Sequence, residues 1–242
     1  MIKTKIKEAV AWLEINRPKH KNALSIQLLE DLLKTLQKLD SDESVRVIVI
    51  FGKENFSAGG DINDMLISSE KEAIEIAKKV QSIYLKISQI SKPIIAYTKG
   101  LVFGGGFELA LVCDIILSHP NANFSLPEAK LGIVPGGGAT QRLKRVIGEQ
   151  NAAYLLFTGE QFSAQWMLSL HLIQEVTDDL DRVRYISNLI AEKNPEAIKE
   201  LKILLKKDMD LEAETNSFSK LLQNDGNKGI RTFLKDKKWP KW

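Results

Sequence analysis

The sequence predicts an α/β fold, with an α/β core over residues 1–186 and a helical region over residues 187–242. Short runs of β-branched and apolar residues alternate with amphipathic helical stretches in the first part, as in sheets covered by helices. The composition shifts near Ile186, after which helical patterns dominate without a strand signal. At 242 residues the chain can bury a full core, as one large domain or a domain with a small appendage.

The first elements predicted are a strand, a helix and a second strand. Val10–Ile15 alternates apolar and polar residues, as a strand does, and the proline that follows prevents its continuation. Asn22 or Ser25 can cap the next helix, in which leucines recur at helical spacing as far as Leu39. Val45–Phe51 is nearly all apolar and rich in β-branched residues, which predicts a central buried strand.

The middle of the chain alternates helices, short strands and glycine turns. Phe56–Asp61 is a small-residue loop whose aspartate can cap the segment that begins at Ile62. The pattern predicts a helix over Glu70–Ile90, and strands over Ile94–Tyr97, Ile115–Ser118 and Ala122–Ser125.

The second half is mostly helical. The patterns predict helices over Ala139–Val146 and Asn151–Thr158, a helix and a short strand within Phe162–Val176, and helices over Asp181–Lys193, Pro195–Met209 and Leu211–Phe233. Asn194 followed by a proline is a favourable start for the helix at Pro195.

The composition excludes several classes of protein. The net charge of +3 is too mild to imply nucleic acid, and a modest basic excess suits an anionic small ligand or a solvated surface. A single cysteine, Cys113, allows no internal disulfide, and the three histidines are too scattered for a metal site. No signal-peptide core or run of transmembrane length is visible, so we expect a soluble cytoplasmic protein.

The stretch from Gly100 to Gly138 carries the chemistry-bearing residues. It holds two glycine triplets and the glutamates Glu108 and Glu128. A triplet before a helix predicts a tight turn, whose unpaired N–H groups and helix dipole suit a developing negative charge. Taken singly, Glu108 could be a first-turn acid favoured by the dipole, and Glu128 an ordinary surface turn residue. Together these features predict half of an active site.

Three motifs, SAGGDI, GGGFE and LPEAKLGIVPGGG, resemble the enoyl-CoA hydratase/isomerase (crotonase) superfamily in sequence and order. The resemblance runs almost from end to end of the chain. It implies a crotonase-like spiral of ββα repeats with a C-terminal helical trimerisation region. Such trimers usually pair into hexamers.

The resemblance also implies roles for four residues. By motif position, Gly60 and Gly105 supply the two backbone N–H groups of an oxyanion hole for a thioester carbonyl. Glu108 and Glu128 fall on the two glutamate positions of the hydratases, where a carboxylate pair activates water and delivers a proton. No separate cofactor is implied, because coenzyme A enters as part of the substrate.

Substrate contacts follow from the same motifs. The residues implied are Lys19, Lys21 and Ala23 after the first strand, Ala58, Asp61 and Ile62 in the second loop, Gly136, and Phe233 from a neighbouring subunit. Two positions depart from the family pattern. Asn63 stands where many relatives have a lysine, and Asp236 stands in a tail that is usually lysine-rich.

The predicted reaction is reversible hydration of a trans-2-enoyl-CoA to a 3-hydroxyacyl-CoA, as a hydro-lyase. One alternative is a Δ3,Δ2-enoyl-CoA or dienoyl-CoA isomerase, of which the former needs only a base at the Glu128 position. A second is a non-catalytic acyl-CoA binder that retains the fold. The partners expected are an acyl-CoA thioester and further copies of the chain, without nucleic acid or membrane.

Overall fold

Two sheets form the centre of the computed structural model, which describes all 242 residues. The larger sheet has the order β1-β2-β3-β4-β6-β9, and only its β1–β2 pair is antiparallel. Its strands are β1 Ile2–Lys7, β2 Val10–Ile15, β3 Val47–Phe51, β4 Ile94–Thr98, β6 Ile115–Ser118 and β9 Glu175–Val176. The smaller sheet joins β5 Leu101–Phe103, β7 Asn123–Ser125 and β8 Phe162–Ser163.

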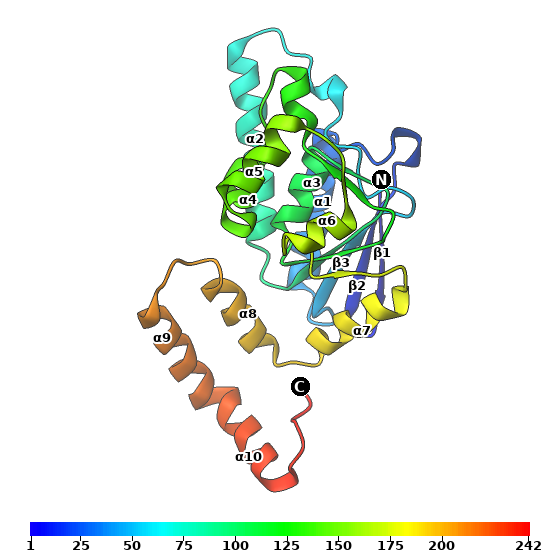
Figure 1. Ribbon diagram of the computed structural model, residues 1–242. Helices are drawn as coiled ribbons and strands as arrows, with labels where there is room; N and C mark the ends of the chain where they lie inside the picture. The colour runs from blue at the N-terminus through cyan, green and yellow to red at the C-terminus, as the bar shows by residue number, and fades with distance from the viewer.

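Helices of the core cover the sheets, and most of the C-terminal helices project away from them (Figure 1). Those of the core are α1 Ile26–Ser41, α2 Glu70–Ser88, α3 Gly105–Val112, α4 Ala139–Ile147, α5 Glu149–Thr158 and α6 Ala164–Ser169. The C-terminal helices are α7 Leu180–Ala191, α8 Pro195–Leu204, α9 Leu211–Leu221 and α10 Asn227–Asp236. Short 3₁₀ turns lie at Pro18–His20, Ile62–Met65 and Pro127–Leu131. No helix is both long and apolar enough to cross a membrane.

Helix α3 lies in the middle of the main core. Its Phe107, Leu109 and Ala110 are fully buried, and they pack with the inner face of β2 and the leucines of α1 in one apolar cluster. Glu108 is the only charged residue of this helix and is itself buried. A carboxyl group in such a place needs hydrogen-bond donors or a proton, which marks the position as chemically unusual.

Helix α7 covers the other face of the large sheet. Its Val183 and Ala191 pack against Val10 and Val47 in a second, smaller cluster. The helix runs without a break across the end of the region predicted to be the core, residues 1–186. The division into two regions at that position stays a prediction.

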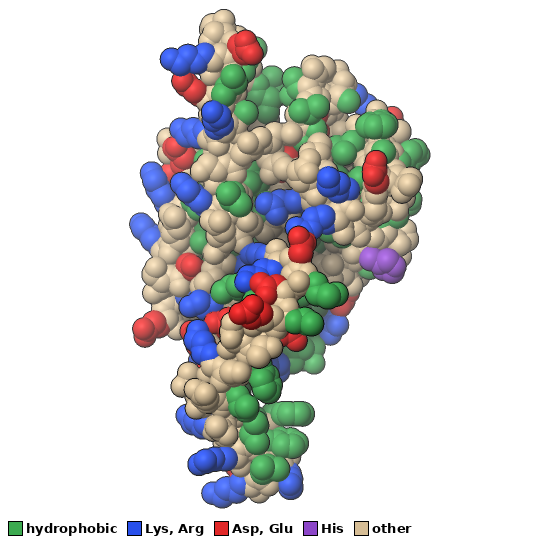
Figure 2. Space-filling model, turned by 90° about the vertical axis from the view of Figure 1, so that its left-hand side faces the viewer, with side chains coloured by type: hydrophobic (Ala, Val, Ile, Leu, Met, Phe, Trp, Pro, Cys, Tyr) green, Lys and Arg blue, Asp and Glu red, His purple; other side chains and the backbone are tan.

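Beyond α7 the chain forms an arm that projects from the core (Figure 1). Lys202 of α8 ties the arm to the core, because its Nζ donates to Asp114 Oδ2 at 2.6 Å and to the Lys92 carbonyl oxygen at 2.8 Å. The arm leaves large apolar side chains exposed, among them Leu201, Phe218 and Leu234. Figure 2 shows such side chains gathered along one side of the lower projection of the molecule.

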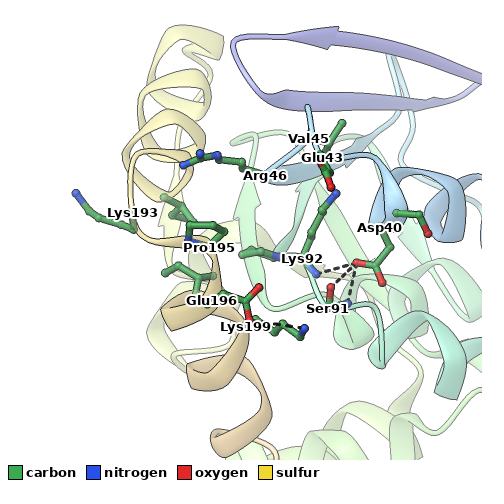
Figure 3. Close-up of a pocket in the computed structure, with 14 residues that line it drawn as sticks. Asp40, Glu43, Val45, Arg46, Ser91, Lys92, Lys193, Pro195, Glu196 and Lys199 are labelled. Atoms are coloured by element: carbon green, nitrogen blue, oxygen red, sulfur yellow. Dashed lines mark hydrogen bonds and ion pairs between the residues drawn. The ribbon is translucent and has the colours of Figure 1, made fainter. Parts of the chain in front are cut away.

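The joint between core and arm contains a hollow of about 320 Å³ (Figure 3). Its central polar groups are paired with one another. Asp40 Oδ1 accepts from Ser91 N, Ser91 Oγ and Lys92 N, and Lys92 Nζ donates to the Leu39 carbonyl oxygen. These bonds hold the end of α1 against the start of β4, so we interpret the hollow as a structural joint.

The structure corrects the sequence-based prediction at several elements. Strand β1 was not predicted, because it lies at a sheet edge and nearly all of its residues are exposed. Strand β5 was not predicted either, because it is only three residues long and lies between Gly100 and Gly104. The helix predicted over Pro195–Met209 ends at Leu204. The one predicted over Leu211–Phe233 is interrupted by a π-helical turn at Leu222–Gly226, where the backbone of Asn224 leaves the helical region.

Candidate active site

The first glycine triplet makes a turn that only glycine permits. Gly104 has φ 45°, and a Cβ on it would lie 2.9 Å from Glu128 Oε1. A Cβ on Gly106 would lie 2.5 Å from the Cβ of Ser57. The absence of side chains therefore lets α3 start directly against the loop Ser57–Asp61 and the Glu128 carboxyl group.

That loop runs beside β5 and brings a second backbone amide to the helix start. Ser57 N donates to the Leu101 carbonyl oxygen at 2.9 Å, and Phe103 N donates to that of Ser57 at 3.0 Å. The Gly60 nitrogen lies 3.3 Å from the Cβ position of Gly105, so the two residues are neighbours. Neither the Gly60 nor the Gly105 N–H donates to a protein acceptor. Two adjacent free donors at a helix start are the arrangement of an oxyanion hole.

Glu108 is held by the second glycine triplet. Its Oε1 accepts from Gly137 N at 2.7 Å and from Ala139 N at 3.0 Å. Burial raises the pKa of Glu108, while these amides and the nearby Arg142 guanidinium oppose the rise. A Cβ on Gly137 would lie 2.8 Å from Glu108 Oε2, so this glycine is required for the contact.

Glu128 lies in the 3₁₀ turn Pro127–Leu131 and is not held in this way. Its Oε2 is buried and has no hydrogen-bond partner in the protein. Burial raises the pKa of Glu128 to about 7, and the Glu108 carboxylate adds to the rise. Two carboxyl groups with different environments can divide the work of acid and base, with Glu128 as the proton carrier.

Tyr84 of α2 also belongs to this cluster. Its hydroxyl group donates to the Gly105 carbonyl oxygen at 2.7 Å. Its ring lies 2.9 Å from the Cβ position of Gly137. Burial and the two nearby carboxylates raise the pKa of Tyr84 well above its ordinary value, so the hydroxyl stays a donor. The sequence pattern does not single out this tyrosine, because nothing in its spacing on α2 points to the site.

The two loops predicted to hold coenzyme A are joined to each other. Leu24 N donates to the Gly59 carbonyl oxygen at 2.7 Å, and Asp61 N donates to that of Leu24 at 3.0 Å. Arg17 pairs with Asp61 at 2.6 Å, and this hydrogen bond lowers the pKa of Asp61. The Asp61 carboxylate therefore supports the loop, and it caps the turn that begins at Ile62 by accepting from Asn63 N.

The remaining predicted contacts are placed as follows. Lys19 and Lys21 are exposed, Ala23 and Ala58 are half-buried beside them, and Ile62 is exposed. A Cβ on Gly136 would meet no atom within 4 Å. The backbone amides that donate to Glu108 belong to Gly137 and Ala139 instead. Their roles toward a ligand stay predictions. No group of three or more His, Cys, Asp or Glu side chains is placed to hold a metal ion.

Phe233 lies on α10, at the far end of the arm from α3 (Figure 1). It stacks on Trp239, with ring centroids 4.7 Å apart. It therefore does not reach the glutamates of its own chain, and its predicted role needs a second copy of the chain.

Comparisons with known proteins agree with this architecture. The family model described as enoyl-CoA hydratase/isomerase matches residues 5–242. The chain is 34% identical to the 2,3-dehydroadipyl-CoA hydratase of Escherichia coli K12, over 94% of this chain and 92% of the relative. It is 33% identical to the crotonyl-CoA hydratase of Syntrophomonas wolfei, over 96% and 94%.

A solved structure of an enoyl-CoA hydratase from Bacillus anthracis superposes with a TM-score of 0.92 at 27% identity, covering 100% of this chain and 98% of that one. The match therefore includes the projecting arm as well as the core. The chain belongs to the enoyl-CoA hydratase/isomerase family and has its crotonase-like fold.

Proposed function

We propose that this enzyme hydrates trans-2-enoyl-CoA thioesters reversibly to 3-hydroxyacyl-CoA. The observation that carries the proposal is the carboxyl pair, in which Glu108 is held by two amides and Glu128 has a pKa raised to about 7. Beside it lie the free N–H groups of Gly60 and Gly105. The relatives named as hydratases support the same reaction.

Each group has a defined part in the proposed reaction. The thioester carbonyl oxygen accepts hydrogen bonds from the N–H groups of Gly60 and Gly105. Glu108, as carboxylate, takes a proton from water while the water oxygen bonds to C3 of the enoyl chain. The C2–C3 π electrons move toward the carbonyl oxygen, and Glu128 gives its proton to C2. Dehydration runs through the same steps in reverse.

The mode of substrate binding and the assembly belong to the same proposal. Coenzyme A enters as part of the substrate, with its phosphates near Lys19 and Lys21, and no other cofactor is needed. The exposed apolar side of the arm favours a homotrimer or hexamer, because a single chain leaves it uncovered. Light scattering of the purified chain measures the assembly directly.

Hydration of crotonyl-CoA, followed by loss of its absorbance, tests the reaction. We expect Glu108→Gln and Glu128→Gln each to lower kcat by about 10²–10⁴-fold, with unchanged circular dichroism. Glu75→Gln is the matched control, because Glu75 is exposed on α2 and makes no ion pair. Near-normal turnover in both site variants would contradict the proposal.

The same assay separates the alternatives. Turnover of a 3-enoyl-CoA that exceeds hydration, with activity retained in Glu108→Gln, would favour an isomerase that uses one base. Tight binding of acyl-CoA without turnover at any chain length would favour a non-catalytic binder.

A further inference from the structure

A second hollow, of about 540 Å³, lies on the outer face of the large sheet, where α7 no longer covers it. Its floor contains Trp12 of β2, Phe51 of β3 and Tyr97 of β4. Strand pairing sets Phe51 beside Tyr97 and Trp12 beside Val49, so all three aromatic residues share the outer face. Helix α3 and its Glu108 belong to the opposite face.

The floor presents aromatic surface to solvent. Trp12 and Phe51 are only half-buried, and their ring centroids lie 6.1 Å apart at an interplanar angle of 76°. Tyr97 is buried, and its hydroxyl donates to the Thr177 carbonyl oxygen at 3.1 Å. A partly exposed indole beside a second ring offers a surface on which a flat aromatic ligand can stack.

Cations from several elements surround this floor. The residues are Lys3, Lys5 and Lys7 of β1, Lys53 and Lys99 from the loops after β3 and β4, and Arg184 of α7. Glu14 and Asp178 are the only carboxylates of the lining, which leaves an excess of four positive charges. Lys53 pairs with Glu14 of the lining, and Lys7 and Arg184 pair with Glu8 and Asp181 just outside it.

The lysines of β1 alone would have an ordinary explanation, because lysines on an edge strand prevent pairing with other sheets. Three observations go beyond that explanation. Lys99 and Arg184 reach the same hollow from elements that are not edge strands. Lys3, Lys5 and Lys99 form no ion pair with a carboxylate. Lys5 lies directly opposite Trp12 across the β1–β2 pair, so charge and ring adjoin.

We propose that this hollow binds a nucleoside di- or triphosphate, with the base stacked near Trp12 and the phosphates at the surrounding lysines. Its volume lies within the usual range of about 300–1,000 Å³ for small-molecule sites. Stacking on a partly exposed ring and several convergent cations are the features that recognise a flat, polyanionic ligand. This site is separate from the proposed active site and does not depend on the proposed function.

Calorimetric titration of the full chain with ATP, in the oligomeric form that it adopts, tests the proposal. We expect a Kd that rises about tenfold in Lys5→Glu and in Trp12→Leu, since each change removes one of the two recognition elements. Lys34→Glu is the control, because Lys34 is also an exposed lysine and lies on α1, away from the hollow. Quenching of tryptophan fluorescence by ATP, lost in Trp12→Leu, gives a second measurement.

ATP resembles the nucleotide part of coenzyme A and could therefore bind at Lys19 and Lys21 of the proposed active site. One control addresses this second binding site. ATP binding must persist in a Lys19→Ala, Lys21→Ala double variant. Loss of ATP binding in this double variant would overturn the proposal.

Three other results would also overturn it. The first is no binding of ATP or ADP at millimolar concentration by the folded chain. The second is inorganic triphosphate binding as tightly as ATP, without an effect of Trp12→Leu. The third is binding of single-stranded oligonucleotides but not of mononucleotides.

Discussion

At the scale of single residues, Glu128 is distinguished by a carboxyl group that holds its proton near neutral pH. Its ordinary pKa is 4.5, and burial raises it to about 7. Between these values the folded protein binds more protons than the unfolded chain, so the free energy of unfolding falls as pH rises through this window. The same proton is the one that the proposed reaction delivers to C2.

This difference predicts a pH dependence. We expect kcat/KM for hydration to fall as pH rises above about 7, because Glu128 then loses its proton. We also expect the stability of the wild type relative to Glu128→Gln to decline between pH 4.5 and 7, because glutamine does not titrate. Urea unfolding of both proteins across this range measures the decline. Parallel pH profiles would show that Glu128 has an ordinary pKa.

Tyr84 provides a second prediction at this scale. Tyr84→Phe removes the hydrogen bond to the Gly105 carbonyl oxygen, at 2.7 Å, beside one of the two proposed oxyanion donors. Without this bond the Gly105 backbone is free to turn, and its N–H group then points less well at the thioester oxygen. We expect kcat to fall about tenfold with little change in KM, since the weaker hydrogen bond lowers transition-state binding by roughly 1–2 kcal/mol. Tyr185→Phe is the control, because Tyr185 is exposed on α7. A change in KM alone would contradict a positioning role.

At the scale of elements, the site is assembled from the ends of helices and from tight turns. α3 starts at the first glycine triplet, and α4 follows the second, whose amides hold Glu108. Both triplets are needed because backbone and side-chain atoms approach within about 3 Å of the missing Cβ positions of Gly104, Gly106 and Gly137. The spacing of the motifs indicated these turns, but not which atoms they contact.

Two neighbouring glycines of the second triplet, Gly136 and Gly137, allow a matched test of the packing around Glu108. Gly137→Ala would bring a Cβ within 2.8 Å of Glu108 Oε2 and 2.9 Å of the Tyr84 ring. We expect it to cost about 1–3 kcal/mol of stability and most of the activity. A Cβ on Gly136 meets nothing within 4 Å, so Gly136→Ala should leave the Tm nearly unchanged. Equal Tm values for both variants would contradict this packing.

The sequence predicted most of the core elements well. The strands predicted at Val10–Ile15, Ile94–Tyr97 and Ile115–Ser118 are found in the structure, the second with one further residue, and of the two predicted caps Ser25 is the one observed. Strand β1 was missed, because its alternation of lysine with apolar residues lies on a sheet edge with little burial. The break in the last helix was missed as well, because apolar residues stand at helical spacing on both sides of it.

At the scale of the whole molecule, a buried ion pair helps to hold the arm on the core. The Lys202 ammonium group is buried against Asp114, whose carboxylate also accepts from Ile94 N at the start of β4. Losing a buried partner costs more than losing an exposed one does. Lys206 of the arm also pairs with Asp114, at 3.9 Å, and Arg46 of the core donates to the Trp242 carbonyl oxygen at 2.9 Å, so the Lys202 pair is the most buried of several contacts that hold the arm.

Lys202→Met tests that dependence. We expect a loss of about 1.5–3 kcal/mol in stability and faster proteolysis between α7 and α8, because Asp114 loses its nearest cation and keeps only the more distant Lys206, at 3.9 Å. Lys199→Met is the control, since its pair with Glu196 is exposed at 3.9 Å and contributes less than about 1 kcal/mol. If both variants unfold alike, the buried pair does not anchor the arm.

The sequence by itself determined the order of helices and buried strands, the glycine turns, and the choice of Glu108 and Glu128 among many acids. Periodicity and turn chemistry are local properties, and the ordered motifs are legible without contacts. Only the tertiary structure decided that Gly137 lies between Glu108 and the Tyr84 ring, and that Trp12, Phe51 and Tyr97 form one floor beneath lysines of another strand. Those contacts join residues far apart in the chain, and they arise from strand register and helix packing, which local pattern does not specify.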